Sequence, residues 1–247
     1  MNAETVALIE ESQGWRELAL AAEAGRLPQS VGVSLPSVMH GAFAEMYGRL
    51  VLGDDGLWVD GAHPDMISAG GANAAPTIEE CRRLQGELAL HPLSAERRLA
   101  VVWSADRLAA EASNSLLKIT EEPPVHGCIL FISEENNLIP TIKSRIWSVH
   151  IDLPEEMTKP APAPRDVREW ARWMDVGRKP SPEILFLEMQ GWARDFAGRG
   201  DYMRASELDT LIRIMEQRRL PVSMIQDAAF AVLKEGVPYE KILGGLW

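Results

Sequence analysis

Cysteine is scarce in this sequence, and its scarcity excludes two kinds of scaffold. The 247 residues contain only Cys81 and Cys128. Two isolated thiols build neither a disulfide framework nor a four-cysteine zinc site, and they suit a reducing cytosol. The five histidines are scattered, and no pair has the spacing that places two metal ligands on one helix face. The composition therefore predicts a cytoplasmic protein without a metal site.

Long apolar runs are also missing. No run reaches the about 18 residues that a membrane-spanning helix needs. The amino-terminal segment 1–11 is acidic and lacks the basic start and apolar centre of a secretory signal. We therefore expect no membrane partner.

Positive charge is in short supply. The chain has 25 basic and 36 acidic residues, a net charge of −11. Residues 1–150 carry most of the excess, with 11 basic against 20 acidic residues, and residues 1–80 contain no lysine. Proteins bind phosphate backbones with clustered Lys and Arg. We therefore do not expect this chain to bind DNA on its own, and we attribute its acidity to solubility.

Apolar strands and amphipathic helices alternate in the first 153 residues. Strands are predicted at 30–34, 99–103, 128–132 and 147–151. Helices are predicted at 5–24, 39–52, 77–90 and 109–121. Thr77 and Glu80 have the spacing of a capping box, while the glycine-rich segment 63–75 is predicted to be a loop. Such alternation is typical of a parallel sheet flanked by helices.

The composition changes after this region. Segment 154–164 contains four prolines and is predicted to be a semi-rigid linker. Residues 165–247 carry three apolar stripes at helical spacing, which predicts a small helical bundle. Eight tryptophans are a high number, and tryptophan is frequent in binding hot spots. Apolar stripes nevertheless form a domain's own core more often than an interface.

Two motifs carry the most specific signal. They are Asn114-Ser-Leu-Leu-Lys-Ile-Thr-Glu-Glu-Pro-Pro124 and, after an apolar strand, Pro140-Thr-Ile-Lys-Ser-Arg145. Together they closely resemble the core of the bacterial DNA polymerase III clamp-loader subunits of the AAA+ class, gamma/tau and especially delta-prime. His63-Pro64-Asp65 and Ala105-Asp106-Arg107 are similar to the delta-prime branch. The clear resemblance covers residues 63–150.

The resemblance implies a fold and a division into domains. Residues 1–153 would form a P-loop NTPase-like AAA+ domain, a parallel sheet flanked by helices, and residues 165–247 an all-helical collar-like domain. The family also has a three-helix lid, for which residues 154–180 are too few. Its four-cysteine zinc module is absent from this sequence, because the segment where it belongs contains only Cys81.

The resemblance assigns a role to Arg145. In the family, the arginine of Thr-Ile-x-Ser-Arg-Cys acts on a neighbouring subunit's ATP, and Thr141, Ser144 and Arg145 match this element, whereas Ile146 replaces the cysteine. An arginine supplied in this way, called an arginine finger, stabilises the charge of the phosphoryl-transfer transition state and typically raises the rate by about 10³–10⁵-fold. The planar guanidinium does this better than the ammonium group of lysine. The alternative is an ordinary surface arginine in a salt bridge.

The turn that corresponds to the P-loop is degenerate. A working loop needs glycines whose N–H groups cradle phosphates, a lysine for the β/γ-phosphates and a Ser or Thr for Mg²⁺. The segment from Ser34 to Gly41 has no Gly-Lys pair, Pro36 and Met39 intrude, and His40 precedes the glycine. We expect no bound nucleotide and no cofactor.

The second acidic element of the family's ATPases is also lost. By alignment on the first motif, Trp103 and Ser104 stand where gamma-type subunits carry the Asp-Glu pair that holds Mg²⁺ and orients water. Asp106 either binds a metal or caps a helix that starts near Leu108, and the cap is the favoured interpretation. Ser133 falls near the family's sensor position, where it would have no phosphate to contact.

The sequence therefore predicts a subunit without ATPase activity of its own. The resemblance implies gamma/tau and delta subunits as partners, with the sliding clamp and primed DNA reached through the complex. Two other hypotheses stay open, namely a decayed AAA+ interaction module outside the replisome and an NTPase with an atypical loop.

Overall fold

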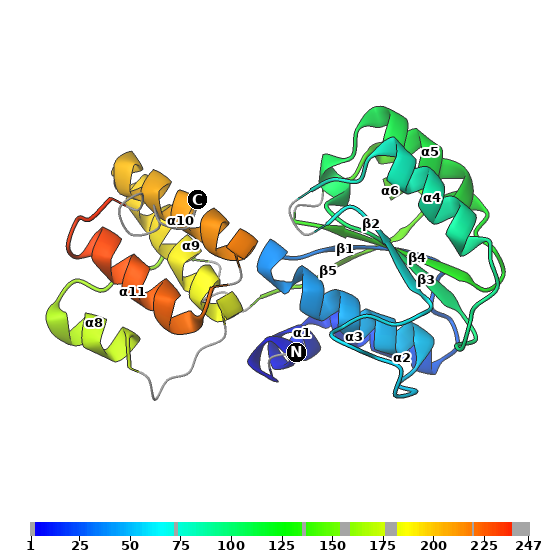
Figure 1. Ribbon diagram of the computed structural model, residues 1–247, viewed down its shortest axis with the longest axis horizontal. Helices are drawn as coiled ribbons and strands as arrows, with labels where there is room; N and C mark the ends of the chain where they lie inside the picture. Colours follow the sequence, from blue (N-terminus) through cyan, green and yellow to red (C-terminus); the bar gives the residue numbers. More distant parts are fainter. Residues whose placement is uncertain are drawn as a thin grey trace. The chain divides into compact units, whose positions relative to one another are not determined.

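Five parallel strands form the centre of the amino-terminal part of the chain, in the order β2-β3-β4-β1-β5 (Figure 1). The strands are β1 (Ser30–Ser34), β2 (Met66–Ala69), β3 (Arg98–Val102), β4 (Gly127–Ser133) and β5 (Trp147–His150). Every residue of β1, β3 and β4 is buried, as expected for parallel strands with helices on both faces. The predicted parallel sheet flanked by helices is thus confirmed.

The structure is a computed structural model that describes residues 3–71, 74–134, 137–153, 159–175, 182–218 and 220–238. The chain divides into two units, Met1–Asp152 and Leu153–Trp247. Residues 154–158 of the predicted linker and 176–180 of the segment compared with the lid lie outside the described residues.

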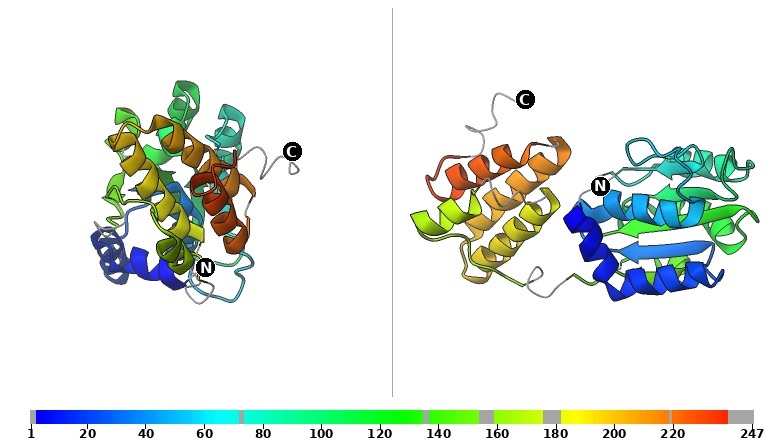
Figure 2. Two further views of the ribbon diagram at one scale, coloured as in Figure 1. Left: turned by 90° about the vertical axis from the view of Figure 1, so that its left-hand side faces the viewer. Right: turned by 90° about the horizontal axis from the view of Figure 1, so that it is seen from below.

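Helices cover both faces of the sheet. They are α1 (Ala3–Glu11), α2 (Gln13–Glu23), α3 (His40–Leu52), α4 (Ile78–Leu88), α5 (Ala110–Glu121) and α6 (Pro140–Lys143), with the 3₁₀ turns η1 (Ser37–Met39) and η2 (Ala105–Arg107). Helices α2 and α3 lie on one face, and α4, α5 and α6 on the other (Figures 1 and 2). The sheet is therefore a layer between two helical layers.

Two expectations for this unit were wrong. The predicted helix 5–24 is two helices, because the Ser12 hydroxyl accepts the N–H of Trp15 at 3.2 Å and caps α2. The predicted loop 63–75 contains the edge strand β2, which pairs with β3. An edge strand that is only partly buried has a weak apolar pattern, so its main-chain pairing was not visible in the sequence. The capping box of Thr77 and Glu80 at the start of α4 is confirmed.

The carboxyl-terminal unit is helical. Its helices are α8 (Val167–Trp173), α9 (Pro182–Gly198), α10 (Tyr202–Arg218) and α11 (Val222–Leu233). Trp170, Trp173 and Trp192 are buried and pack edge-on or tilted, with ring centroids 4.9–5.8 Å apart, and Phe230 lies 5.3 Å from Trp170. These tryptophans therefore build the unit's own core. Among the described helices of the chain, none is long and apolar enough to cross a membrane.

Gly14 allows α2 to pack closely on β5. A Cβ atom at Gly14 would lie 2.2 Å from the His150 carbonyl oxygen and 2.6 Å from the Val149 side chain. Because the nearest atom belongs to the backbone, the clash is not relieved by a rotamer change. Gly86, in the exposed interior of α4, has no such neighbour within 4 Å.

We expect Gly14→Ala to lower the free energy of unfolding by at least about 2 kcal/mol, because overpacking displaces α2 from β5. Gly86→Ala is the matched control and should raise it by about 0.5–1 kcal/mol, the ordinary helical gain of alanine over glycine. Urea denaturation of both variants checks this. An equal gain in both would show that α2 does not pack against β5 as described.

Candidate functional site

Arg145 lies in the short connection between α6 and β5. Pro140 occupies the first turn of α6, where its missing N–H costs nothing. Ile142 is fully buried and anchors this one-turn helix to the core. Ser144 ends the helix, and β5 begins at Trp147. Arg145 therefore stands on a short segment that is held at both ends.

The Arg145 guanidinium is exposed and also hydrogen-bonded. Its side chain is 36% accessible. Nε donates to the Glu121 carboxylate, and Nη1 donates to the Thr141 carbonyl oxygen at 2.7 Å and the Ser144 hydroxyl at 3.1 Å. Thr141, Ser144 and Arg145, which the sequence pattern grouped, are thus in direct contact. The salt bridge of the alternative interpretation is present as well, and Glu121 as its partner was not predicted.

Ile146 packs against the middle of the sheet. Its Cδ1 atom lies 2.4 Å from the position that a Cβ of Gly32 in β1 would occupy. The side chain that replaces the family's cysteine therefore fills the space that Gly32 leaves open. This departure from the family pattern changes the packing next to Arg145 and leaves the arginine exposed.

The loop that corresponds to the P-loop carries no positive charge. It runs from Ser34 at the end of β1 through η1 to the first residues of α3, and Met39 is buried within it. His40 is buried, with Nε2 3.0 Å from the Leu35 carbonyl oxygen, so Nε2 carries the proton. Burial lowers the pKa of His40, and the hydrogen bond to Leu35 opposes this only in part. This loop therefore contains a neutral imidazole and no lysine.

The other residues of this loop show no arrangement that is specific for phosphate binding. The Ser34 hydroxyl lies 2.8 Å from His150 Nδ1. Pro36 is extended, with φ −55° and ψ 138°, immediately before η1. A Cβ at Gly41 would have no neighbour within 4 Å, so this glycine is not there for a close approach of another backbone.

A carboxylate faces this loop from the end of β4. Glu134 accepts hydrogen bonds from the Ser37 hydroxyl at 3.2 Å and from Arg107 Nη2 at 3.3 Å. Because Glu134 and Arg107 form an ion pair, this pair adds no net positive charge for phosphate oxygens at the loop. The residues present therefore do not fit a nucleotide triphosphate. The sequence pattern gave no sign of Glu134, because its role comes from the pairing of β1 with β4.

The remaining family positions have structural roles. Ser133 is buried, and its hydroxyl donates to the Val33 carbonyl oxygen at 3.0 Å. Ser104 has a left-handed backbone with φ 46° and donates to Gly71 O at 3.0 Å. The predicted cap by Asp106 is wrong, because α5 begins at Ala110 without a side-chain cap and Asp106 lies in η2. Within the described ranges, no group of three or more His, Cys, Asp or Glu is arranged to hold a metal ion.

The His63-Pro64-Asp65 motif lies at the other end of the sheet. Asp65 directly precedes β2 and is fully buried. Its carboxylate accepts the N–H groups of Leu93, Ser94 and Ala95, the last two at 2.8 and 2.9 Å, and the Ser94 hydroxyl at 2.9 Å. His63 Nδ1 accepts the Asp65 N–H at 3.0 Å. The motif thus fixes the loop that leads into β3 and is remote from the P-loop equivalent.

The carboxylate of Asp65 links stability to pH. Burial alone would raise its pKa, but the hydrogen bonds from Ala95, Leu93 and Ser94 lower it to about 2, below its ordinary value of 3.8. A pKa that is lower in the folded state adds stability above pH 4, which is lost as the pH falls through 4 towards 2.

We expect acidification from pH 5 to pH 2 to remove about 2.5 kcal/mol of stability through Asp65. Asp65→Asn should abolish this part of the pH dependence and cost about 3 kcal/mol at pH 7, since an amide brings N–H groups towards three N–H donors. Asp60→Asn, at an exposed left-handed position that suits Asn, is the control. Urea denaturation at several pH values measures both. Equal slopes in the two variants would contradict the role of Asp65.

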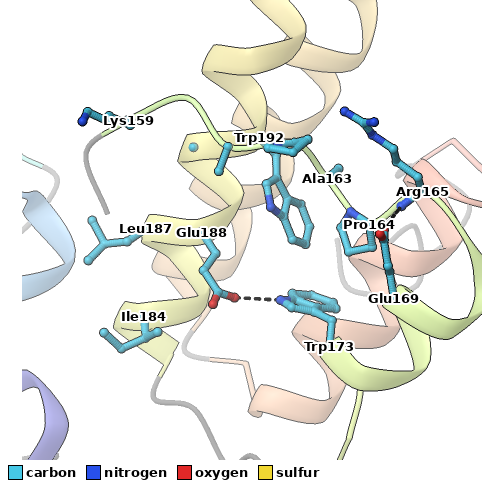
Figure 3. Close-up of a pocket in the computed structure, with 13 residues that line it drawn as sticks. Lys159, Ala163, Pro164, Arg165, Glu169, Trp173, Ile184, Leu187, Glu188 and Trp192 are labelled. Carbon is cyan, nitrogen blue, oxygen red and sulfur yellow. Dashed lines mark hydrogen bonds between the residues drawn. The ribbon is translucent and has the colours of Figure 1, made fainter. Parts of the chain in front are cut away.

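A cavity of about 670 Å³ lies in the carboxyl-terminal unit (Figure 3). The proline-rich segment 159–165 forms one wall and α8 and α9 the others. The segment is attached by the Ala161 N–H, which donates to the Gly191 carbonyl oxygen at 3.2 Å. Trp173 donates its Nε1–H to Glu188 at 2.7 Å at the cavity wall. The described part of the predicted linker is thus packed on the bundle.

The sheet order places β1 between β4 and β5, with a strand–turn–helix element at its carboxyl end, where open parallel sheets of this type bind their ligands. The unit is thus a parallel α/β sheet with a candidate ligand site at the carboxyl end of β1.

Comparisons with known proteins show a similarity over part of the chain. Residues 58–155 match the family model described as DNA polymerase III, delta subunit. DNA polymerase III subunits gamma/tau of Mycobacterium bovis and Mycobacterium tuberculosis are 32% identical over 88 residues, which is 35% of this chain and 14% of those proteins. Over the matched residues, this chain is similar to DNA polymerase III clamp-loader subunits. It matches only about a seventh of the length of these relatives.

A solved structure, of a DNA polymerase III gamma subunit-related protein from Thermotoga maritima, aligns with 89% of this chain and 84% of its own length. The TM-score is 0.48 and the sequence identity 17%.

Proposed function

We propose that this chain is a non-catalytic clamp-loader subunit of the delta-prime type. It presents Arg145 to the ATP of a neighbouring subunit and scaffolds the loading of the sliding clamp onto primed DNA. The observation that carries the proposal is an exposed guanidinium, anchored next to β5, on a chain whose own nucleotide loop has a neutral His40 and faces Glu134. An exposed arginine on such a chain can stabilise the transition state of ATP hydrolysis in the active site of a neighbouring subunit.

The same geometry supports the proposal that the subunit has no ATPase activity of its own. Phosphates need cationic and N–H donors, whereas the loop of this chain offers a buried imidazole and a proline and faces a carboxylate. The subunit would therefore need no cofactor and would contribute by position and charge.

The family match supports the choice of partners. The region shared with gamma/tau subunits makes the gamma/tau and delta subunits of DNA polymerase III the expected neighbours. The sliding clamp and primed DNA would be contacted through the assembled complex, in the cytoplasm. The amino-terminal unit would be the AAA+ domain and residues 165–247 the collar, without the lid.

Arg145→Ala should leave the subunit folded but lower ATP turnover at the adjacent site of a reconstituted loader by about 10³-fold or more. Arg145→Lys should restore little of it, because an ammonium does not replace the planar guanidinium. Single-turnover ATP hydrolysis by the complex measures this. Unchanged turnover in both variants would overturn the proposed role of Arg145.

Two further measurements separate the competing hypotheses. Calorimetric titration of the isolated chain with Mg-ATP should give no saturable binding, because Glu134 and the missing lysine disfavour phosphate. Co-purification from native cytosol should recover gamma/tau and delta subunits. Recovery of the chain without either subunit would favour a decayed AAA+ interaction module, and tight Mg²⁺-dependent ATP binding would favour an NTPase with an atypical loop.

A further inference from the structure

The Arg145 guanidinium uses Nε and Nη1 for hydrogen bonds within its own domain. Nε is bound by Glu121, and both hydrogens of Nη1 are directed to Thr141 O and the Ser144 hydroxyl. No hydrogen bond from Nη2 to any described residue is present. The guanidinium is therefore held along one edge by its own domain, and one amino group is left for an external acceptor.

The backbone around Glu121 is held in place by neighbouring contacts. It is the last residue of α5, and the segment that follows is held by Gln29, whose side-chain amide donates to Pro124 O at 2.8 Å and Gly127 O at 2.9 Å. The end of α5 is thus connected to the start of β4. A carboxylate in this position fixes Arg145 Nε from a second, independent element besides α6.

We propose that Glu121 is the positioning residue for Arg145, selecting one rotamer of the guanidinium before the neighbouring subunit's ATP is engaged. The proposal rests on the proposed function. It also gives the Asn114–Pro124 motif a role that the arginine motif alone left unassigned. The two motifs, Asn114–Pro124 and Pro140–Arg145, meet in this one contact.

The strength of the pair is suited to positioning. The side chains of Arg145 and Glu121 are 36% and 46% accessible, so water screens their attraction. Exposed ion pairs are weak, which leaves the guanidinium able to bond a triphosphate. Glu121 restricts the rotamers of Arg145 in advance. The side chain therefore loses less conformational entropy when it binds the ATP. Ordering one such side chain corresponds to about two- to tenfold in rate.

The decisive variants separate the hydrogen bond from the charge. Glu121→Ala removes both, and it should lower kcat of the reconstituted loader with gamma/tau and delta subunits by about two- to tenfold with KM for ATP unchanged. Glu121→Gln keeps an oxygen acceptor for Nε and should restore kcat. Glu122→Ala removes the same charge from the adjacent exposed residue and is the matched control, with kcat unchanged.

A second readout uses the isolated full chain. The ¹⁵Nε–H resonance of Arg145 should be ordered and protected from exchange in the wild type and in Glu121→Gln, and mobile in Glu121→Ala. This measurement does not depend on ATP or on partners, so it tests the contact separately from the function.

The outcomes distinguish the two hypotheses. If Arg145→Ala abolishes turnover while Glu121→Ala leaves kcat unchanged, positioning by Glu121 is wrong and the proposed function stands. If Glu121→Ala raises turnover, Glu121 withholds the arginine, and the positioning role is likewise wrong. If the resonance behaves as expected but Arg145→Ala has no effect on turnover, the proposed function fails although the contact exists.

Discussion

The pairing of β1 with two neighbours is the constraint on which the candidate site depends. β1 lies between β4 and β5 and hydrogen-bonds to both along its length. This brings Ser34 beside Ser133 and His150, which are about a hundred positions away in the chain. Because all strands are parallel, their carboxyl ends meet at one edge of the sheet. The degenerate loop and Glu134 lie at this edge, and the connection that carries Arg145 leads into β5.

The chemistry at this edge is defined by the sign of its charges. A nucleotide site concentrates positive potential, through a lysine and a helix amino terminus, on the phosphates. Here the amino terminus of α3 follows β1, but His40 is kept neutral by burial and Glu134 is paired with Arg107. The loop at the carboxyl end of β1 therefore offers no net positive charge among these residues. Arg145 precedes β5 and therefore lies at the opposite, amino-terminal edge of the parallel sheet.

The carboxyl-terminal unit illustrates how composition can mislead. Tryptophan is common in binding hot spots, but Trp170, Trp173 and Trp192 are buried against one another and against α11. A unit of this size has little interior, and large rings fill it with few residues. The apolar stripes of this unit therefore form its own core, as their helical spacing indicated. The proline-rich segment before it is packed on α9 where the structure describes it.

Local sequence patterns were sufficient to predict most secondary-structure elements and the similarity to clamp-loader subunits. Continuous apolar runs predicted β1, β3 and β4, the spacing of Thr77 and Glu80 predicted the start of α4, and two motifs indicated the similarity to clamp-loader subunits. These signals are local, because they depend on neighbours a few positions away. The folded structure was needed to show that segment 63–75 contains an edge strand, that Ser12 divides the first helix, and that Asp106 does not cap α5. It also decided which carboxylates face Arg145 and the nucleotide loop, because Glu121 and Glu134 reach them through contacts 24 and 97 residues apart in the chain. No local pattern encodes such contacts, since they form only when the strands and helices pack together.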